Sequence, residues 1–416
     1  MTHIAVIGAG ITGVTSAYCL ARAGFEVSVL DRHRYPAMET SFANGGQLSA
    51  SHTEVWNSVA TLQKALRWMW HSDAPLLLNP APSWHKYSWI AEFIAQIRHH
   101  DANSVATTRM AIEARQYLFA MAEAEGIAFD LEKRGILHLY HDAHTLAEAA
   151  AATRLLKQGG LERVAVTNEE IHQLEPTLTG QYAGGFFTES DSTGDIHQFT
   201  RGLARACERK GVTFYQDVQV VQAEASETGV ALHWRAVNEL GEFAAAVPPE
   251  VLACDAVLVC AGVGSRSLAQ MLGDRVNVYP VKGYSITLHL DDARSRANAP
   301  WVSLLDEHAK IVTSRLGESR LRVAGTAEFN GENRDIRADR IAPLLQWVRE
   351  NFDIETANAV PWAGLRPMMP NMMPVIQRGQ RRRVYYNTGH GHLGWTLSAA
   401  TAELVTALIA SDAAVL

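Results

Sequence analysis

The chain has 416 residues, with 44 acidic side chains against 37 basic ones, so its formal net charge is −7. Apolar residues make up 47 % and charged residues 19 %, which excludes a disordered or collagen-like chain and predicts two or three domains. A pI near 6.2 argues against a nucleic-acid partner, because binding phosphates requires clustered lysine and arginine.

The cysteine and hydropathy patterns predict a protein of the reducing cytoplasm. No CxxC pair occurs, so neither a zinc site nor a disulfide framework is expected. No run of 18 uncharged apolar residues is present, and the apolar start of the chain lacks the basic leader of a signal peptide. We expect a cytoplasmic protein, or one bound peripherally at the inner face of the cell membrane. The cysteines are Cys19, Cys207, Cys254 and Cys260.

The first thirty residues predict a strand, a tight turn, a helix and a second strand. Residues 4–7 form a short apolar run, 15–23 have a helical pattern, and 25–30 alternate like a strand. Such a βαβ opening places a parallel sheet at the start of the chain.

The composition changes between residues 55 and 100, where tryptophan and proline are frequent. Helices are then expected over about 102–125 and 143–157. Extended segments follow at 135–140, 184–188, 278–290, 309–314 and 320–325. This pattern predicts a second, α+β domain built on a mixed or antiparallel sheet plus helices.

The parallel-sheet pattern returns later in the chain. A helix is expected over 199–210 and a helix over 395–409, the latter with Leu397, Leu404, Val405 and Leu408 on one face; strands are expected over 212–215, 256–260 and 384–387. The predicted fold class is therefore α/β, a discontinuous Rossmann-like domain with a substrate domain inserted. The Rossmann-like domain comprises residues 1–50, 190–275 and 355–416, and the substrate domain 51–189 and 276–354.

Gly8, Ala9, Gly10, Ile11, Thr12 and Gly13 fit the GxGxxG pattern of a dinucleotide-binding turn. The first glycine permits the turn, the second lets a pyrophosphate approach the backbone, and the third lets helix and strand pack closely. Asp31 follows the second strand, where an acid accepts ribose hydroxyls. Because Arg32 follows it, NADP is still an alternative cofactor, although an acid at position 31 disfavours a 2′-phosphate.

A second glycine-rich segment, NTGHGHLGWT at 387–396, lies between a strand and a helix. Its glycines permit close approach to a planar ring, and the following helix N-terminus favours negative charge there. A reduced flavin carries such charge, so the segment favours FAD over NAD; a plain helix cap is the alternative.

Six motifs together resemble the D-amino-acid dehydrogenase small-subunit family, within the D-amino-acid oxidase and sarcosine oxidase superfamily of FAD enzymes. They are GAGITG, ETSFANGGQLS (39–49), TGDIHQFT (193–200), YPVKGYS (279–285), GLRPMMP (364–370) and NTGHGHLGWT, so the resemblance spans almost the whole chain. It implies an FAD-binding Rossmann-like domain and oxidation of an amino acid.

The resemblance implies a set of cofactor contacts along the chain. Residues 8–13, Asp31 and Arg32 would meet the adenosine and pyrophosphate, and Val218 the adenine. The pyrophosphate and ring would contact Ser41, Asn44, Gly45, Gln47 and Leu48. A second loop would comprise Cys260, Ala261 and Gly262, although the Cys260 side chain is expected to be a buried small hydrophobe. The pyrimidine edge would meet Gly389, His390, Gly391, Leu393, Gly394, Trp395 and Thr396.

Arg366 matches the superfamily arginine that binds a substrate carboxylate through two parallel N–H donors. Tyr284 is a candidate for a second substrate contact, with a core tyrosine as the alternative. His52 would face the substrate amine, where relatives often carry tyrosine. We expect His197, His390 and His392 to be hydrogen-bonded structural histidines.

The implied reaction is hydride transfer from the amino-acid α-carbon to flavin N5, followed by hydrolysis to a 2-oxo acid and ammonia. No general base is assigned, because alignment dominates such a step. No cysteine follows Cys260, so the FAD is expected to be non-covalent. Val323 matches, by its spacing to Gly325, the oxygen-activating lysine of the oxidases, which favours a dehydrogenase that passes electrons to a quinone or another carrier.

D-Proline or hydroxy-D-proline is the main rival substrate, and a sarcosine-type oxidase or a non-catalytic FAD-binding subunit are further alternatives. The tryptophan-rich stretch 56–89, with Lys64, Arg67 and Lys86, could dock on a membrane surface or form an aromatic wall of the substrate domain. The sequence leaves the oligomeric state undecided, and either a homo-oligomer or a hetero-oligomer is possible.

Overall fold

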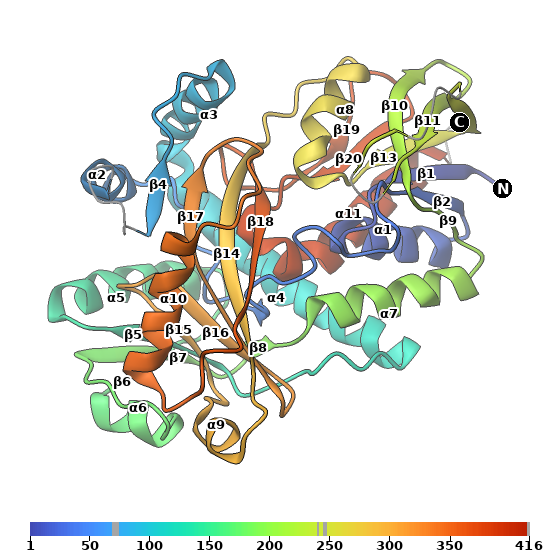
Figure 1. Ribbon diagram of the computed structural model, residues 1–416. Coiled ribbons are helices and arrows are strands. Elements are labelled where there is room, and N and C mark those ends of the chain that lie inside the picture. The colour runs from blue at the N-terminus through green and yellow to red at the C-terminus, as the bar shows by residue number, and fades with distance from the viewer. Residues whose placement is uncertain (69–74, 239–240, 244–247, 414–416) are drawn as a thin grey trace.

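The computed structural model describes residues 1–68, 75–238, 241–243 and 248–413 (Figure 1). Within these ranges, two large sheets organise the chain, and both contain strands from distant parts of the sequence. This arrangement confirms the predicted α/β fold class with a mixed second sheet.

The first sheet has six strands in the order β19-β20-β13-β1-β2-β9. All neighbours are parallel except the edge pair β19–β20. Strands from the beginning, middle and end of the chain thus lie side by side. Their bounds are β1 His3–Ile7, β2 Glu26–Leu30, β9 Thr213–Tyr215, β13 Ala256–Val259, β19 Val375–Arg378 and β20 Val384–Thr388.

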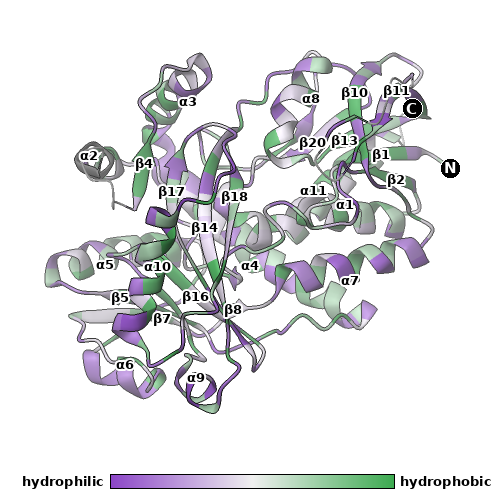
Figure 2. Ribbon diagram, in the orientation of Figure 1, coloured by the Kyte–Doolittle hydropathy of each residue, from purple (hydrophilic) through white to green (hydrophobic). Residues whose placement is uncertain are grey.

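Alternate residues of β1 pack into two cores, one on each face of this sheet. Ile4 and Val6 contact a layer of four helices, α1, α4, α7 and α11, while Ala5 and Ile7 face the small sheet β10–β12 and α8. Figure 2 shows hydrophobic residues along β1, β13 and α11. The bounds are α1 Ile11–Arg22, α4 His100–Glu125, α7 Ile196–Arg209, α8 Ser265–Met271, α11 Gly394–Ala413, β10 Val218–Ala225, β11 Val230–Ala236 and β12 Glu250–Cys254.

The second sheet has nine strands in the order β18-β14-β17-β16-β15-β5-β7-β6, with β4 paired to β17. It is mostly antiparallel, and α10 packs its apolar face on β14 and β17. The strands are β4 Leu76–Leu78, β5 Ile136–Tyr140, β6 Val164–Val166, β7 Gly184–Thr188, β14 Tyr279–His289, β15 Ser303–Asp306, β16 Ile311–Leu316, β17 Arg320–Phe329 and β18 Val360–Met368.

The remaining elements surround this second sheet. In Figure 1, α2 and α3 project at one end, beside β4. The elements are α2 Val59–Trp68, α3 Trp84–Ala95, α5 Ala143–Gln158, α6 Asn168–Leu174, α9 Ala293–Asn298, α10 Ala338–Asn351, the short pair β3 Gln47–Leu48 and β8 Ser192–Thr193, and the 3-10 turns η1 Ile97–His99, η2 Gly262–Gly264 and η3 Gly391–Leu393.

The predicted domain boundaries stay a prediction. Two elements, however, belong to a different sheet from the one in which those boundaries place them. Strand β18, placed by its position in the range 355–416, belongs to the nine-stranded sheet. Helix α4, placed in 51–189, packs into the core of the six-stranded sheet through Leu118 and Met121. The chain therefore crosses between the two sheets more often than the sequence pattern indicates.

Among the described residues, one helical stretch, Gly391–Ala413, is long and apolar enough to cross a membrane. In the structure 67 % of its apolar window is buried, and α11 packs against α1 and α4. Packing in the core accounts for this apolar character. Leu404, near the end of this helix, is 49 % exposed, whereas Leu397 and Val405 are fully buried.

Candidate active site

The first glycine-rich turn follows β1 and leads directly into α1, four residues earlier than the sequence pattern predicts. Gly8 has φ +109°, and a Cβ there would lie 2.7 Å from the carbonyl oxygen of Cys260. A Cβ on Gly13 would lie 1.8 Å from the Gly8 carbonyl oxygen, so only glycine allows the helix to start this close to the strand. The amino end of α1 therefore opens beside the turn, where it can bind a phosphate.

Asp31 lies next to this turn with both carboxylate oxygens fixed. They accept the backbone N–H groups of Ala9 at 2.6 Å and His33 at 2.8 Å. Burial raises the pKa of Asp31 above its ordinary value, and these two bonds oppose that rise. The carboxylate is thus held where a ribose would lie. Arg32 beside it forms an ion pair with Glu39.

The loop 41–48 connects the turn to the nine-stranded sheet. The Ser41 hydroxyl accepts the N–H of Ile11 at 3.0 Å, at the first residue of α1. The Gln47 side chain donates to the serine hydroxyl of β15 at 2.8 Å. Leu48 is different, because its side chain is buried in the helix-covered core.

Segment 260–262 passes over the opening turn, and its backbone rather than its thiol lies at the site. The Cys260 thiol faces the Ser16 hydroxyl in the core, and burial raises its pKa to about 12. It is therefore an inert buried side chain, as expected. The N–H of Val218 donates to the Asp31 carbonyl at 3.0 Å, so this group is already engaged.

The second glycine-rich turn joins β20 to α11 and packs against the end of β18. Gly389 and Gly391 have φ +75° and +59°, in the left-handed region. A Cβ on Gly389 would lie 2.4 Å from Cγ of Met369, so a side chain here would be both strained and obstructed. This places the GLRPMMP and NTGHGHLGWT motifs against each other.

Both glycine-rich turns line one cavity of about 1130 Å³. This exceeds the roughly 300–1,000 Å³ of a site for one small molecule, so a dinucleotide and a small substrate have room together. Of the predicted cofactor residues, Ala9, Gly13 and Leu48 do not line it; the others do. These are Gly8, Gly10, Ile11, Thr12, Asp31, Arg32, Ser41, Asn44, Gly45, Gln47, Val218, Cys260, Ala261, Gly262, Gly389, His390, Gly391, Leu393, Gly394, Trp395 and Thr396.

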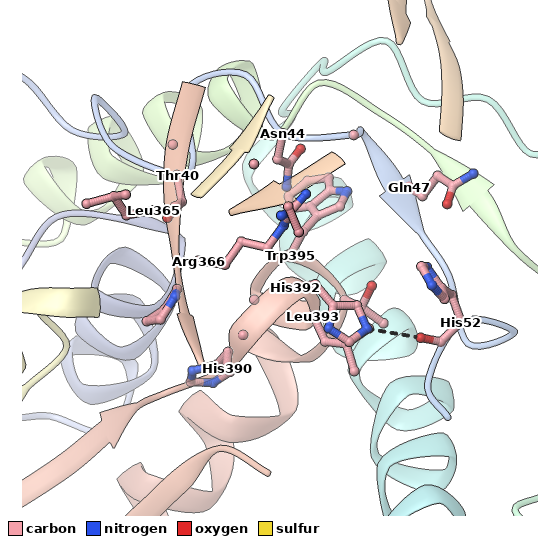
Figure 3. A pocket seen from close by; sticks show the side chains of 18 of the residues that line it. Thr40, Asn44, Gln47, His52, Leu365, Arg366, His390, His392, Leu393 and Trp395 are labelled. Carbon is pink, nitrogen blue, oxygen red and sulfur yellow. Dashed lines mark hydrogen bonds between the residues drawn. The ribbon is translucent and has the colours of Figure 1, made fainter. Parts of the chain in front are cut away.

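Arg366 projects from β18 into the cavity (Figure 3). Its guanidinium lies across Gly283 of β14, where a Cβ would come within 2.3 Å of the guanidinium carbon. Nη1 donates to the Thr326 carbonyl at 3.3 Å, and in the described part of the chain no carboxylate forms an ion pair with it. Burial lowers the pKa of Arg366 to about 10. A partly buried guanidinium without a counter-ion, open to the cavity, is suited to bind a ligand carboxylate.

His52 and two aromatic neighbours form a wall of the cavity (Figure 3). The His392 ring lies 5.2 Å from the His52 ring and stacks on Trp56 at 4.8 Å. Burial lowers the pKa of His52 to about 4, and the positive charge of Arg366 contributes, so His52 is neutral at pH 7. Figure 3 shows His52 and His392 joined by a hydrogen bond.

The family model for FAD dependent oxidoreductases matches residues 3–408. D-amino acid dehydrogenase 3 of Mesorhizobium japonicum is 53 % identical over 413 residues, covering 99 % of this chain and 98 % of its own. D-amino acid dehydrogenase of Paramagnetospirillum magneticum is 38 % identical over 420 residues, covering 98 % and 94 %. The chain belongs to the FAD-dependent oxidoreductase family. It is thus an FAD-dependent oxidoreductase.

Solved structures of low sequence identity share its fold. Glycine oxidase from Geobacillus kaustophilus superposes with a TM-score of 0.74 at 18 % identity, covering 99 % of this chain and 95 % of its own. L-proline dehydrogenase from P. horikoshii gives 0.74 at 15 % identity, covering 99 % and 94 %.

The residues around the cavity fit FAD. Two turns that require glycine lie against it, the amino ends of α1 and α11 open at them, and a fixed carboxylate, Asp31, stands beside the first. These features suit a pyrophosphate, a flavin ring and a ribose. The four cysteines are buried, and burial raises the Cys260 pKa. Non-covalent binding of the FAD stays a prediction.

The Tyr284 hydroxyl has a partner inside the protein, and its predicted substrate contact stays a prediction. Its hydroxyl donates to Oε2 of Glu328 at 3.0 Å, and Glu328 also pairs with Lys282 at 2.8 Å, all inside the second core. The alternative stated from sequence, a core tyrosine with a satisfied hydroxyl, describes it. The Tyr284 ring still contributes to the cavity wall.

The comparison of Val323 with the oxidase lysine is wrong in its geometry. Val323 is fully buried in the core under α10 and does not face the cavity. The neighbouring Arg322 points the other way and donates to the Asn44 carbonyl at 3.1 Å. The cation beside the predicted flavin loop is therefore Arg322, and burial lowers its pKa to about 10.

Thr326 is a site residue that sequence reasoning missed. The β14–β17 register shifts by one residue beside Gly283, which leaves Thr326 without a partner across the strands. Its φ is +54°, a strained value for a β-branched residue. This bulge brings the Thr326 carbonyl to Arg366. No composition signal marks it, because it arises from the pairing of two distant strands.

The sequence also gave no indication of a hydrogen-bonded chain of side chains that lies beside His52. Ser51 Oγ lies 2.9 Å from Nε2 of His138, and Nδ1 of His138 lies 2.9 Å from Glu307, which pairs with Lys310. Burial lowers the pKa of His138 to about 4. The residues are far apart in sequence, so no motif indicates them.

Two other histidines have the structural contacts predicted for them, whereas the tryptophan-rich stretch agrees with its prediction only in part. His197 bonds the Ala37 carbonyl at 3.2 Å and His390 bonds Thr401 at 2.9 Å, as structural histidines do. Lys86 is buried and donates to two backbone carbonyls, so it cannot meet a lipid headgroup. Trp56 lines the cavity, as the aromatic-wall interpretation expects. Trp70 and the side chains of Lys64 and Arg67 lie outside the described residues.

Proposed function

We propose that the enzyme oxidises D-amino acids to 2-oxo acids and ammonia and delivers the electrons to a quinone or another carrier. The observation that carries this proposal is Arg366, a partly buried guanidinium without a carboxylate partner among the described residues, in the cavity that both glycine-rich turns line. The relatives named D-amino acid dehydrogenase, which match over nearly their whole length, support the same substrate class.

Arg366 would bind the substrate carboxylate through two parallel N–H donors and so fix the α-carbon. Bound FAD supplies the two-electron acceptor for the α-hydrogen. The amine would react deprotonated, and the resulting iminium acid would hydrolyse to the 2-oxo acid and ammonia. No side chain is assigned as a general base.

Anaerobic bleaching of the flavin absorbance tests this proposal. The FAD-loaded protein would be mixed with D- and L-amino acids, D-proline, hydroxy-D-proline and sarcosine. We expect bleaching by D-amino acids, with formation of the 2-oxo acid. Bleaching by sarcosine or L-amino acids alone, or none at all, would refute the substrate class.

A second measurement tests the acceptor. Turnover with a soluble quinone analogue should exceed the rate of hydrogen peroxide formation in air by at least about tenfold. Equal rates would make the enzyme an oxidase.

We also propose a cytoplasmic location with electron delivery at the inner face of the cell membrane. On α3, Trp84 is 83 % exposed and Tyr87 is 48 % exposed, which supports this contact. Co-sedimentation with anionic vesicles, compared between the protein and its Trp84→Ala variant, tests it. Equal sedimentation of both would remove this helix from the contact.

A further inference from the structure

The turn that joins β15 to β16 places an ion pair on the cavity wall. Glu307 and Lys310 both line the cavity, and Nζ of Lys310 lies 2.5 Å from Oε2 of Glu307. The Lys310 side chain is 44 % exposed and that of Glu307 is 20 % exposed. A ligand in the cavity can therefore reach both partners of the pair.

This turn is held in one conformation. One carboxylate oxygen of Asp306 accepts the backbone N–H groups of His308 and Ala309, each at 2.9 Å. The other oxygen accepts the indole N–H of Trp347 at 2.9 Å. Lys310 has φ +55°, in the left-handed region, which is uncommon for a residue other than glycine. Such residues persist where the surrounding structure fixes them, and they cluster at binding and catalytic sites.

The same turn lies close to the arginine that is suited to bind the substrate carboxylate. The Lys310 carbonyl oxygen lies 3.1 Å from the position that a Cβ on Gly325 would occupy. The next residue, Thr326, accepts from Nη1 of Arg366 at 3.3 Å. The three strands concerned are neighbours in the order β14-β17-β16. With about 4.8 Å between neighbouring strands, Lys310 is about 10 Å from Gly283, across which the guanidinium lies.

The ion pair offers a donor at one end and an acceptor at the other. In the described part of the chain the Lys310 ammonium donates to Glu307 alone, so further N–H groups are left for a ligand oxygen. Oε1 of Glu307 lies 2.9 Å from Nδ1 of His138 and accepts from Tyr140 at 3.4 Å. Oε2 accepts from Lys310 and has a lone pair for a second N–H.

We propose that Lys310 and Glu307 bind a carboxamide at the end of the substrate side chain, which makes D-glutamine a favoured substrate. The amide oxygen accepts from Lys310 and the amide N–H donates to Glu307, while Arg366 binds the α-carboxylate. The proposal rests on the function proposed above and names the substrate class of that site. A neutral carboxamide carries an acceptor and a donor side by side, whereas Glu307 repels a carboxylate and Lys310 repels an ammonium.

The length of glutamine matches the separation of the two binding groups. With bonds of about 1.5 Å, the carboxyl carbon and the amide carbon of an extended glutamine are about 5 Å apart. A hydrogen bond of about 3 Å at each end brings the span to about 11 Å, close to the distance given by two strand spacings. D-Alanine is too short to reach the ion pair when its carboxylate is on Arg366.

The test uses three carboxylates of the same shape that lack an α-amine and are not oxidised. Glutarate monoamide ends in a carboxamide, glutarate in a carboxylate, and 5-methylhexanoate in two methyl groups. Dissociation constants would be measured with the FAD-loaded protein from the change in flavin absorbance and, independently, from the rise in Tm. We expect the monoamide to bind about tenfold more tightly than either of the others, the strength of one hydrogen bond.

Two variants separate the partners of the pair. Lys310→Met should reduce the preference for the monoamide over 5-methylhexanoate by about fivefold or more, because one bond is lost. Glu307→Gln leaves the ammonium without its carboxylate, so glutarate should gain about tenfold relative to the monoamide. Lys157→Met is the matched control, because Lys157 also pairs with a glutamate but does not line the cavity, and it should keep the ranking. Should Lys310→Met fail to hold FAD, Lys310→Gly, which suits the positive φ, replaces it.

An unchanged ranking in either the Lys310 or the Glu307 variant would overturn the proposal. Equal binding of all three ligands by the unmodified enzyme would overturn it as well. If D-alanine bleaches the flavin while the three ligands bind alike, the proposed function survives and only this contact fails. If no amino acid bleaches the flavin, the function itself fails, because the binding measurements do not depend on turnover.

Discussion

Replacing Arg366 by methionine should stabilise the enzyme without substrate and weaken its affinity for carboxylates. Burial lowers the pKa of Arg366 from 12.5 to about 10. At about 1.4 kcal/mol per pKa unit, the buried charge costs about 3 kcal/mol. The variant also loses the hydrogen bond to Thr326, about 1 kcal/mol. We therefore expect the free energy of unfolding to rise by about 2 kcal/mol.

The affinity should change in the opposite direction. Two charge-assisted hydrogen bonds contribute about 3–6 kcal/mol, so carboxylate binding should weaken by about 10²–10⁴-fold. Urea unfolding of the FAD-loaded protein measures the first effect, and titration with 2,2-dimethylpropanoate the second. Arg205→Met, on the exposed side of α7, is the control and should change neither. A destabilised Arg366→Met variant with unchanged affinity would make this arginine structural and refute the reasoning.

Three further substitutions test the cofactor end of the cavity. Gly13→Ala should abolish FAD binding, seen as missing flavin absorbance after reconstitution, because its Cβ would lie 1.8 Å from the Gly8 carbonyl oxygen; normal FAD content would contradict the close approach. Asp31→Ala should weaken FAD binding by about tenfold or more by fluorescence titration, and an unchanged affinity would remove the ribose contact. His390→Gln should flatten the acid dependence of stability. Burial lowers the His390 pKa to about 3 against about 6.5 unfolded, so the unfolded chain binds more protons below pH 6.5 and stability falls with the pH. At pH 5 this amounts to about 2 kcal/mol in urea unfolding, which the variant should not lose; parallel pH curves would refute it.

The cofactor end of the site could be predicted from sequence because its determinants are local. Gly8, Gly13 and Asp31 lie within one βαβ unit, and their spacing reflects the geometry of a single turn. The turn at 387–396 is equally local. The return of β20 to the first sheet follows from its short apolar run and glycines.

The substrate end depends on the register between strands, which a single sequence does not reveal. Val323 and Arg322 differ by one position, and that step decides which of them faces the core. The bulge at Thr326 arises from the same pairing, opposite Gly283. Tyr284 sits in the correct strand, but its hydroxyl is taken by a buried carboxylate that the motif does not contain.

The two ends of the cavity also differ in how completely their polar groups are satisfied. At the cofactor end, Asp31 accepts two backbone N–H groups, and Ser41 caps the first residue of α1. At the substrate end, Arg366 lacks a counter-ion among the described residues, Nδ1 of His392 lacks a donor, and Thr326 has a strained backbone. Unsatisfied groups of this kind reduce stability and are retained where a ligand completes them. Since a carboxylate would satisfy the guanidinium, a carboxylate ligand should raise the Tm of the enzyme, and this rise should be lost in the Arg366→Met variant.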